Sequence, residues 1–220
     1  MVINSKGFAM QSSHPLNHKP IIAGTILCAL YALLAIVVNT RVLENPDLDI
    51  TLFLQSVLPR SLDLPSSILS LLGSAEVTIP IFAILVFLSK PPIRVRLVMM
   101  FLLVTFLEVQ GKLMIDQPGP PLLLHRYVFN IATPTGGFDT PYSFPSGHSA
   151  RTAFLVALAV ALIAQSKLPL VTRRVLTALL VVAGAVMLVS RVYIGDHWTS
   201  DVIGGALLSV GLCLFAFLTD

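Results

Sequence analysis

Six stretches of about 20 mostly apolar residues dominate this chain of 220 residues and restrict what it can fold into. A helix of that length crosses the hydrocarbon core of a bilayer with every backbone hydrogen bond satisfied internally. Only 11% of the residues are charged, less than half the ~25% typical of soluble domains. The sequence therefore predicts an all-α, polytopic membrane protein with a bundle of six transmembrane helices. The predicted spans are residues 21–40, 68–89, 97–115, 147–165, 175–194 and 198–218.

The six stretches also predict the domain organisation. Residues 1–20 are polar and form a tail, and residues 21–220 form one membrane domain. The first stretch ends without a small-residue cleavage site, so we expect a retained helix rather than a signal peptide. The segment Leu48–Leu58 is apolar but too short to span, and we expect it to lie at the membrane interface.

The loop charges predict the orientation of the bundle. Basic residues gather in the tail and in the loops after the second and fourth predicted helices: Lys6, Lys19, Lys90, Arg94, Arg96, Lys167, Arg173 and Arg174. Acidic residues gather in the opposite loops: Glu44, Asp47, Asp49, Asp63, Asp116 and Asp139. Positive loops remain on the cytoplasmic side, so both termini are predicted to be cytoplasmic. Topology therefore explains the net charge of +3, and the basic residues form no stripe that would bind nucleic acid.

Five ionisable residues lie at helix ends that this topology brings to the non-cytoplasmic face: Lys112, His148, Arg191, His197 and Asp201. An ionisable group at membrane depth is costly and is by default a candidate for function. We therefore predict that these residues, far apart in sequence, form one site.

The stretch Pro145-Ser146-Gly147-His148 precedes the fourth predicted helix. Serine is a favoured N-cap, glycine allows close approach of a ligand, and the helix N-terminus attracts anions. His148 in the first turn is placed to protonate a leaving oxygen. The alternative is an ordinary turn before a helix, with His148 facing the membrane interface.

The second stretch contains Arg191, His197 and Asp201. His197 and Asp201 are four residues apart and would share one face of a helix. A carboxylate on one ring nitrogen fixes the tautomer and leaves the other as a nucleophile. Arg191 can fold back to grip phosphate oxygens. The alternative is an interfacial His–Asp pair, with Arg191 extending to the lipid headgroups.

The spacing and order of these residues resemble the type 2 phosphatidic acid phosphatase (PAP2) superfamily, with motifs K-x6-R-P, P-S-G-H and S-R-x5-H-x3-D. The second and third motifs are complete, the third from Ser190 onward. In the first, Lys112 is present but Gly119 stands where the family has arginine. Arg151 is the better substitute because it lies one helical turn from His148. Arg126 is the other candidate, unless it is a solvated loop charge.

The resemblance implies a lipid phosphatase that needs no metal or cofactor. His197 would attack phosphorus to form a phosphohistidine, oriented by Asp201, while His148 protonates the leaving lipid oxygen. The resemblance gives a phosphate-binding role to the remaining motif residues: Lys112, Ser146, Gly147 and Arg191. The implied substrates are membrane lipids with a phosphomonoester or pyrophosphate group, such as phosphatidic acid, phosphatidylglycerol phosphate, diacylglycerol pyrophosphate or a polyprenyl pyrophosphate. The site would face the non-cytoplasmic side of a plasma or inner membrane.

Two other functions remain open at this stage. The same phosphoenzyme could transfer phosphate to a lipid or sugar acceptor, or a degenerate site could serve transport or lipid binding. Outside the motifs, Glu108 precedes Lys112 by four residues and is predicted to pair with it. The loop 116–145, rich in proline and glycine, is predicted to cover the site.

Overall fold

The computed structural model describes residues 18–127, 140 and 142–217, and that part of the chain is helical without strands. The tail before residue 18 and residues 218–220 lie outside it. Its α-helices are α1 (His18–Asn39), α2 (Glu44–Val57), α3 (Asp63–Leu72), α4 (Ala75–Leu88), α5 (Pro91–Met114), α6 (Gly147–Gln165), α7 (Leu170–Tyr193) and α8 (Thr199–Phe215). Two short 3-10 helices, η1 (Arg60–Leu62) and η2 (Leu122–Leu124), lie in the connections.

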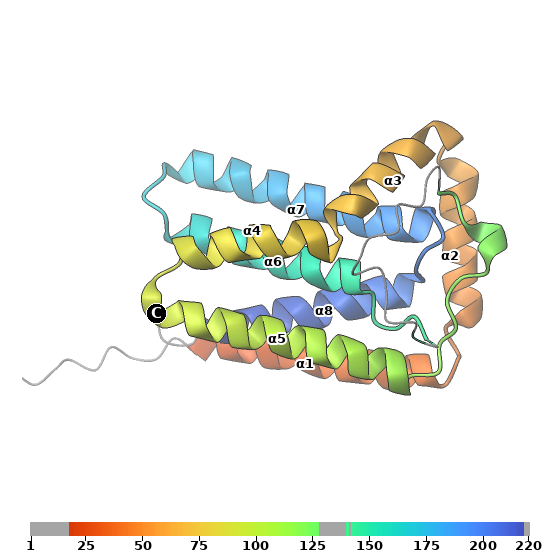
Figure 1. Cartoon of the computed structure of the whole chain (residues 1–220), viewed down its shortest axis with the longest axis horizontal. Coiled ribbons are helices and arrows are strands. Elements are labelled where there is room, and N and C mark those ends of the chain that lie inside the picture. The colour runs from red at the N-terminus through yellow and green to blue at the C-terminus, as the bar shows by residue number, and fades with distance from the viewer. Residues whose placement is uncertain (1–17, 128–139, 141, 218–220) are drawn as a thin grey trace, which may run out of the picture.

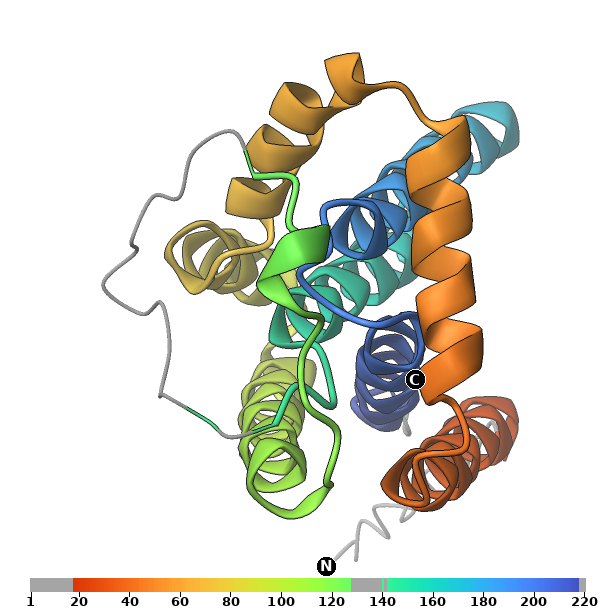
Figure 2. The same cartoon turned by 90° about the vertical axis from the view of Figure 1, so that its right-hand side faces the viewer.

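The long helices form a bundle that is capped at one end. Figure 1 shows α1, α4, α5, α6, α7 and α8 side by side, with α2 crossing one end; Figure 2 shows that end face on. Among the described residues, α1, α6 and α7 are long and apolar enough to cross a membrane. A fourth span results if the bent pair Arg60–Leu72 and Ala75–Leu88 counts as one. The prediction of an all-helical membrane protein is confirmed at this level.

The predicted single helix over residues 68–89 is wrong. The chain forms α3 and α4 instead, with a bend of 51° between the segments 60–72 and 75–88. The break falls at Gly73 and Ser74, a residue pair that commonly interrupts helices. The backbone of Ser74 is extended, and its carbonyl accepts the Thr78 N–H at 2.9 Å to begin α4.

Helix α3 is apolar outside and polar inside. Its residues Leu64, Ile68 and Leu72 are exposed, whereas the serines Ser66, Ser67 and Ser70 are buried. A hydroxyl can be buried at little cost only where it has hydrogen-bond partners. The serine face of α3 therefore marks a polar interior at this end of the bundle.

The short apolar segment Leu48–Leu58 is helical, as part of α2. The 14 residues of α2 are too few to cross a bilayer, as predicted. Asp47 and Thr51 face inward and are 3% and 0% exposed, while Phe53 and Val57 are exposed. Helix α2 therefore covers the end of the bundle with a polar inner face.

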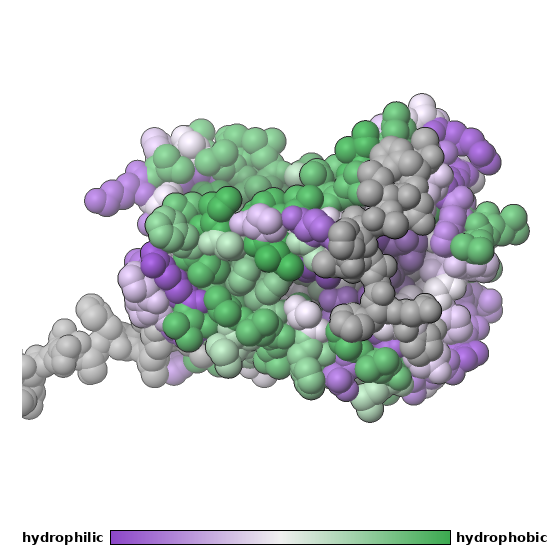
Figure 3. Space-filling model, viewed as in Figure 1, coloured by the Kyte–Doolittle hydropathy of each residue, from purple (hydrophilic) through white to green (hydrophobic). Residues whose placement is uncertain are grey.

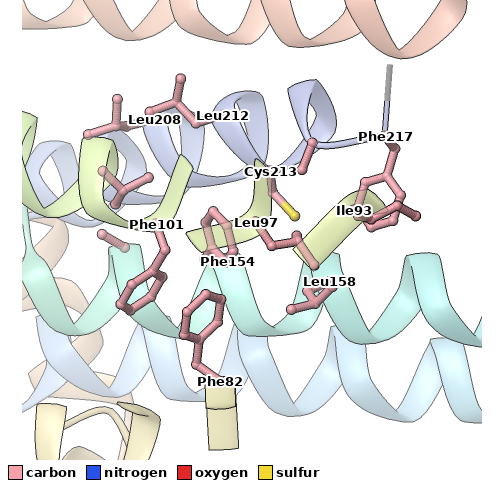
Figure 4. Packing of buried hydrophobic residues seen from close by; sticks show 13 residues of the cluster. Phe82, Ile93, Leu97, Phe101, Phe154, Leu158, Leu208, Leu212, Cys213 and Phe217 are labelled. Atoms are coloured by element: carbon pink, nitrogen blue, oxygen red, sulfur yellow. The ribbon is translucent and has the colours of Figure 1, made fainter. Parts of the chain in front are cut away.

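The apolar core fills the half of the bundle remote from α2. Figure 4 shows Phe82, Phe101 and Phe154 meeting between α4, α5 and α6. The Phe82 and Phe101 rings stack at 4.2 Å, and the Phe154 ring meets the Phe101 ring edge-on at 5.2 Å. Such aromatic pairs each contribute about 0.5–1.5 kcal/mol beyond the area they bury. This core fixes the helices whose other ends hold the polar residues.

The outer surface matches a lipid environment. Figure 3 shows apolar residues over the middle of the bundle and hydrophilic residues gathered towards its two ends. Exposed apolar side chains include Phe87 on α4, Val95 on α5 and Val171 on α7, each about 70% exposed (72%, 69% and 72%). An exposed apolar band of this extent would be costly in water, which supports an integral membrane protein.

Candidate active site

The N-terminus of α6 opens into the site end of the bundle, the end covered by α2. Ser146 is the N-cap of α6, as predicted, and its Oγ accepts the Ser149 N–H at 3.4 Å and the Ser149 hydroxyl at 3.0 Å. Gly147 lies against the Glu108 carboxylate so closely that a Cβ would overlap it. Glycine is therefore required here for the close approach of α5 and α6.

The two predicted motif segments are in direct contact. The Ser146 N–H donates to the Asp201 carbonyl at 3.0 Å, which links the start of α6 to the first turn of α8. A Cβ at Gly205 would lie 2.5 Å from the Ser146 carbonyl and 3.0 Å from the Ala150 nitrogen. The small residue lets α6 and α8 approach closely enough for this contact.

His197 and Asp201 form the predicted pair, although they do not share a helix. His197 lies in the connection before α8, and its Nδ1 is 3.2 Å from the Asp201 Oδ2, in the first turn of α8. The same oxygen accepts the Trp198 N–H at 3.0 Å, as an N-terminal cap. The turn depends on Gly195, whose φ of 72° is readily adopted only by glycine. The prediction that the two side chains share one face of a helix is wrong, because α8 begins at Thr199 and His197 lies in the turn before it.

The surroundings of His197 favour its neutral form. Burial first, and then the positive charge of Arg191, lowers the pKa of His197 well below its ordinary value. When Nδ1–H donates to the Asp201 carboxylate, Nε2 is left with a lone pair. The pair can thus present a neutral, oriented nucleophile.

Two cations from different helices meet at one carboxylate. The Glu108 Oε1 is 3.1 Å from the Lys112 Nζ, so the predicted pair is confirmed, and its Oε2 is 3.6 Å from the Arg151 Nη1. Glu108 is only 6% exposed, whereas the Lys112 and Arg151 side chains are 20% and 17% exposed. The charges of Lys112 and Arg151 act on both His148 and His197. The structure therefore brings Arg151 into the cluster of motif residues.

Arg191 is buried, with 1% of its surface exposed, so it does not extend to the headgroups. Its Nη1 donates to the Ser70 hydroxyl on α3, and its Nη2 forms an ion pair with Asp196. Sequence reasoning missed both partners. Asp196 directly precedes His197 and was visible as a carboxylate beside the predicted nucleophile, whereas no sequence signal marks Ser70.

His148 lies in the first turn of α6 and faces the break between α3 and α4. A Cβ on Gly73 would lie 3.2 Å from the His148 Cδ2. Within the described part of the chain, no hydrogen bond to the His148 ring is found.

Arg126 lies outside this cluster. Its guanidinium donates to the Tyr193 hydroxyl at 3.2 Å and to the Gln55 carbonyl at 2.8 Å, and it lies over the Tyr193 ring at 5.2 Å. Gln55 in turn donates to the Leu124 and Tyr193 carbonyls at 2.8 and 2.9 Å. Arg126 therefore holds the η2 connection against α2 and α7 rather than standing free in solvent.

The first motif leaves space where its arginine is missing. A Cβ on Gly119 would have an ordinary contact of 3.8 Å with the Ser143 Cβ. The preceding carbonyl, of Pro118, accepts the Trp198 indole N–H at 2.7 Å. The predicted cover of the site by the loop 116–145 falls partly on residues 128–139 and 141, outside the described residues.

A second polar network supports the start of α8. The Asp47 carboxylate on α2 accepts the Ser200 N–H at 2.9 Å, the Ser200 hydroxyl at 2.5 Å and the Gln117 amide at 3.3 Å. Gln117 also donates to the Ser200 hydroxyl at 2.9 Å. Asp47 thus caps a helix that belongs to another part of the chain, a role that sequence reasoning did not predict.

Within the described ranges, no group of three or more His, Cys, Asp and Glu side chains could hold a metal ion. The arrangement instead offers nitrogen donors and positive charge to an anion. The positive charges of Lys112, Arg151 and Arg191 act at both histidines, and His148 lies in the first turn of α6. Such a region suits a phosphate group.

Fold and site together define an all-helical integral membrane protein with a cluster of cationic side chains and a His–Asp pair at one end. The sequence model of the PAP2 superfamily matches residues 94–220, more than half of the chain, and includes all three motif segments. The chain belongs to the PAP2 superfamily.

Two individual proteins with assigned activities are similar to parts of this chain. An undecaprenyl-diphosphatase of Sulfolobus acidocaldarius is 33% identical over 64% of this chain and 62% of its own length. Phosphatidylglycerophosphatase B of Bacillus subtilis is 35% identical over 35% of this chain and 37% of its own. The chain therefore matches less than two thirds of the length of each.

Solved structures share the fold. A transmembrane PAP2-type phosphatidylglycerolphosphate phosphatase from Bacillus subtilis superposes with a TM-score of 0.68, covering 91% of this chain and 94% of that one at 21% identity. Aquifex aeolicus LpxE superposes with a TM-score of 0.57, covering 77% of this chain and 93% of that one at 24% identity. At these identities the likeness concerns the fold alone.

Proposed function

We propose that the protein is a lipid phosphatase that hydrolyses a phosphomonoester or pyrophosphate of a membrane lipid through a phosphohistidine on His197. The observation that carries this proposal is the 3.2 Å contact between His197 Nδ1 and the buried carboxylate of Asp201. It leaves Nε2 as the reactive atom beside Arg191. Transport or lipid binding alone would not require an oriented nucleophile.

The proposed reaction has two displacements at phosphorus. In the first, the lone pair of His197 Nε2 forms a bond to phosphorus, the bond to the leaving oxygen breaks, and His148 gives that oxygen a proton. Asp201 stabilises the positive imidazole that forms. In the second, water attacks phosphorus, the N–P bond breaks, and inorganic phosphate leaves. The proton lost by water returns to His148.

The surrounding cations stabilise the charge that builds on the phosphoryl oxygens. Lys112 on α5 and Arg151 on α6 both pair with Glu108, which lies between them. Arg191 comes from the last turn of α7. Amides at the start of α6, next to Ser146 and Gly147, add unpaired donors. Donors fixed before the reaction begins supply the largest catalytic contribution in most enzymes. Positioning and charge stabilisation then suffice without a metal.

We further propose that six spans place this site on the non-cytoplasmic side, with both termini in the cytoplasm. Five spans are α1, α5, α6, α7 and α8, and the sixth is the bent pair α3 and α4. At the end opposite the site, Lys90 and Lys167 lie in the connections, and Arg94 and Arg173 lie near the starts of α5 and α7. The positive-inside rule assigns that end to the cytoplasm.

The class of substrate follows from the site and from the relatives. Clustered cations and a helix N-terminus favour binding of a phosphate group. The exposed apolar side chains on α3 and α4 would contact the hydrocarbon chains of the lipid. The relatives' names refer to undecaprenyl diphosphate and phosphatidylglycerophosphate. Both are lipids with a terminal phosphate, which is the feature we assign to the substrate.

The decisive experiment compares His197→Ala with the wild-type protein in detergent or vesicles. We expect phosphate release from a panel of lipid monophosphates and pyrophosphates by the wild type, and a loss of at least about 10³-fold in the variant. Because the N–P bond of a phosphohistidine is broken by acid and survives alkali, reactions with 32P-labelled lipid that are quenched in alkaline detergent should trap label on the wild-type protein and none on His197→Ala. His125→Ala, which changes a histidine outside the cluster, is the matched control. Wild-type rates in His197→Ala would refute the proposal.

A further inference from the structure

Asp196 lies between the arginine and the nucleophile of the proposed site. One oxygen, Oδ2, forms the ion pair with the Arg191 Nη2 and lies 3.7 Å from the His197 Nε2. The proposed function gives no role to this carboxylate. Yet it touches both groups that a bound phosphate would have to touch.

Burial explains why Arg191 holds an anion. A guanidinium that is 1% exposed is costly without a negative partner. Ser70 and the Tyr127 side chain are neutral partners, and among the described residues the Arg191 Nε has no hydrogen-bond partner. Asp196 is therefore the group that neutralises Arg191 when no substrate is bound.

Asp196 is placed so that it can leave. Its side chain is 24% exposed, whereas that of Arg191 is 2% exposed. Its backbone N–H donates to the Arg191 carbonyl at 3.1 Å, and it follows the turn at Gly195. Rotation of the Asp196 side chain alone, without movement of the backbone, would therefore free the guanidinium.

The position of Asp196 argues against a role as the base that activates water. Water must attack phosphorus in line, from the side opposite the N–P bond to His197. A carboxylate 3.7 Å from Nε2 lies on the side of the histidine instead. The Asp196 Oδ2 instead occupies the position beside Arg191 where an oxygen of the bound phosphoryl group would lie.

We propose that Asp196 is a resident anion, a carboxylate that occupies the place of a phosphate oxygen until substrate displaces it. The idea rests on the proposed function. Binding then exchanges one ion pair of Arg191 for another, so that the net gain in affinity for phosphate is small. After hydrolysis Asp196 takes back Arg191 and helps to expel inorganic phosphate. Asp196 thereby sets the affinity for the product and its release.

The test measures binding of inorganic phosphate with and without this charge. Asp196→Asn keeps the shape and removes the negative charge, and we expect its inhibition constant for inorganic phosphate to fall about tenfold. Calorimetric titration of inorganic phosphate into His197→Ala and His197→Ala/Asp196→Asn should show the same change without turnover. Asp196→Ser provides a second neutral variant if the first does not fold.

Asp116→Asn is the matched control. It removes a carboxylate, at the same end of the molecule, that pairs with the exposed Arg41, and its phosphate affinity should remain that of the wild type. An unchanged or weaker phosphate affinity in both Asp196 variants would overturn the inference while leaving hydrolysis in place. Tighter phosphate binding in a protein that hydrolyses no lipid phosphate would support the anion exchange and refute the proposed function.

Discussion

The protonation state of His197 decides when the proposed nucleophile is available. Because burial and then the charge of Arg191 lower its pKa, the imidazole should remain neutral well below pH 6.5. A lowered pKa moves the loss of activity to a more acidic pH. We expect kcat/KM to hold its plateau down through pH 6.5 and to fall only below it. Rates from pH 4.5 to 8 with a lipid pyrophosphate would check this, and a loss of kcat/KM on acidification that is centred at or above pH 6.5 would contradict it.

Removing the Arg151 side chain should affect KM, whereas removing the Arg126 side chain should affect stability. Arg151 lies in the cluster, 3.6 Å from Glu108, so Arg151→Ala should raise KM at least about tenfold, given about 1.5–3 kcal/mol for a charged hydrogen bond. Arg126 contacts Gln55 and Tyr193, so Arg126→Ala should leave KM near the wild-type value and lower the thermal stability.

Adding back the family's missing cation provides the complementary check. Gly119 has room for a side chain, so Gly119→Arg in the Arg151→Ala background should recover part of the lost affinity. Steady-state kinetics and thermal unfolding on the same preparations separate the two effects. A larger rise in KM from Arg126→Ala than from Arg151→Ala would reverse the assignment.

At the scale of single residues, the sequence predicted contacts that follow from local spacing. The pairs His197–Asp201 and Glu108–Lys112 are each four residues apart, and both are present. The contact of Arg191 with Ser70 joins residues 121 positions apart. Spacing holds no information on that distance, because it depends on how α3 packs against α7.

At the scale of elements, the start of α8 depends on a carboxylate from α2. Asp47 is 3% exposed and accepts the Ser200 N–H at 2.9 Å. Asp47→Ala would leave buried donors unpaired, which costs about 1–3 kcal/mol of unfolding free energy. It should also lower kcat, because Asp201 lies in the same first turn. Denaturation in a fixed detergent and the rate of phosphate release would measure both effects.

Asp49→Ala is the matched control, since Asp49 is an exposed carboxylate two residues along the same helix. It should change neither quantity beyond the error of measurement. If the two variants lost equal stability, the overall charge of α2 would explain the effect, and the capping role of Asp47 would be wrong.

The break between α3 and α4 shows where hydropathy patterns fail. Residues 68–89 have the composition of one span, and composition does not specify the direction of a helix. The bend follows from tertiary packing: Ser70 reaches Arg191, and a Cβ on Gly73 would overlap Met187 and crowd His148. Polar serines within an apolar run were the one sequence signal that this segment faces a polar interior.

At the scale of the whole molecule, burial of apolar segments made the fold class predictable. Within the described residues the apolar runs of the sequence became helices, and the structure aligns over 91% of the chain with one solved PAP2-type phosphatase. The site's position at one end follows from alternating helix direction, which places the start of α6 and α8 beside the ends of α5 and α7. Which side of a membrane that end faces depends on the loop charges.

Labelling of single cysteines would measure the sidedness. Leu123→Cys places a thiol on η2, at the site end, where the leucine is 94% exposed. Leu168→Cys places one in the connection between α6 and α7, at the other end, where the leucine is 42% exposed. Both would be made in a Cys28→Ala/Cys213→Ala background. A membrane-impermeant maleimide on intact cells should label Leu123→Cys at once and Leu168→Cys only after permeabilisation.

The same experiment joins topology to chemistry. If the site end is outside, intact cells should release phosphate into the medium from an added lipid phosphate, and His197→Ala should abolish that release. The positive-inside rule and the catalytic assignment would then agree on one orientation. The reverse labelling pattern, with activity seen only after permeabilisation, would place the site in the cytoplasm. In that case the basic loops with Lys90 and Lys167 would face outward, and the substrate would have to be a lipid phosphate of the inner leaflet.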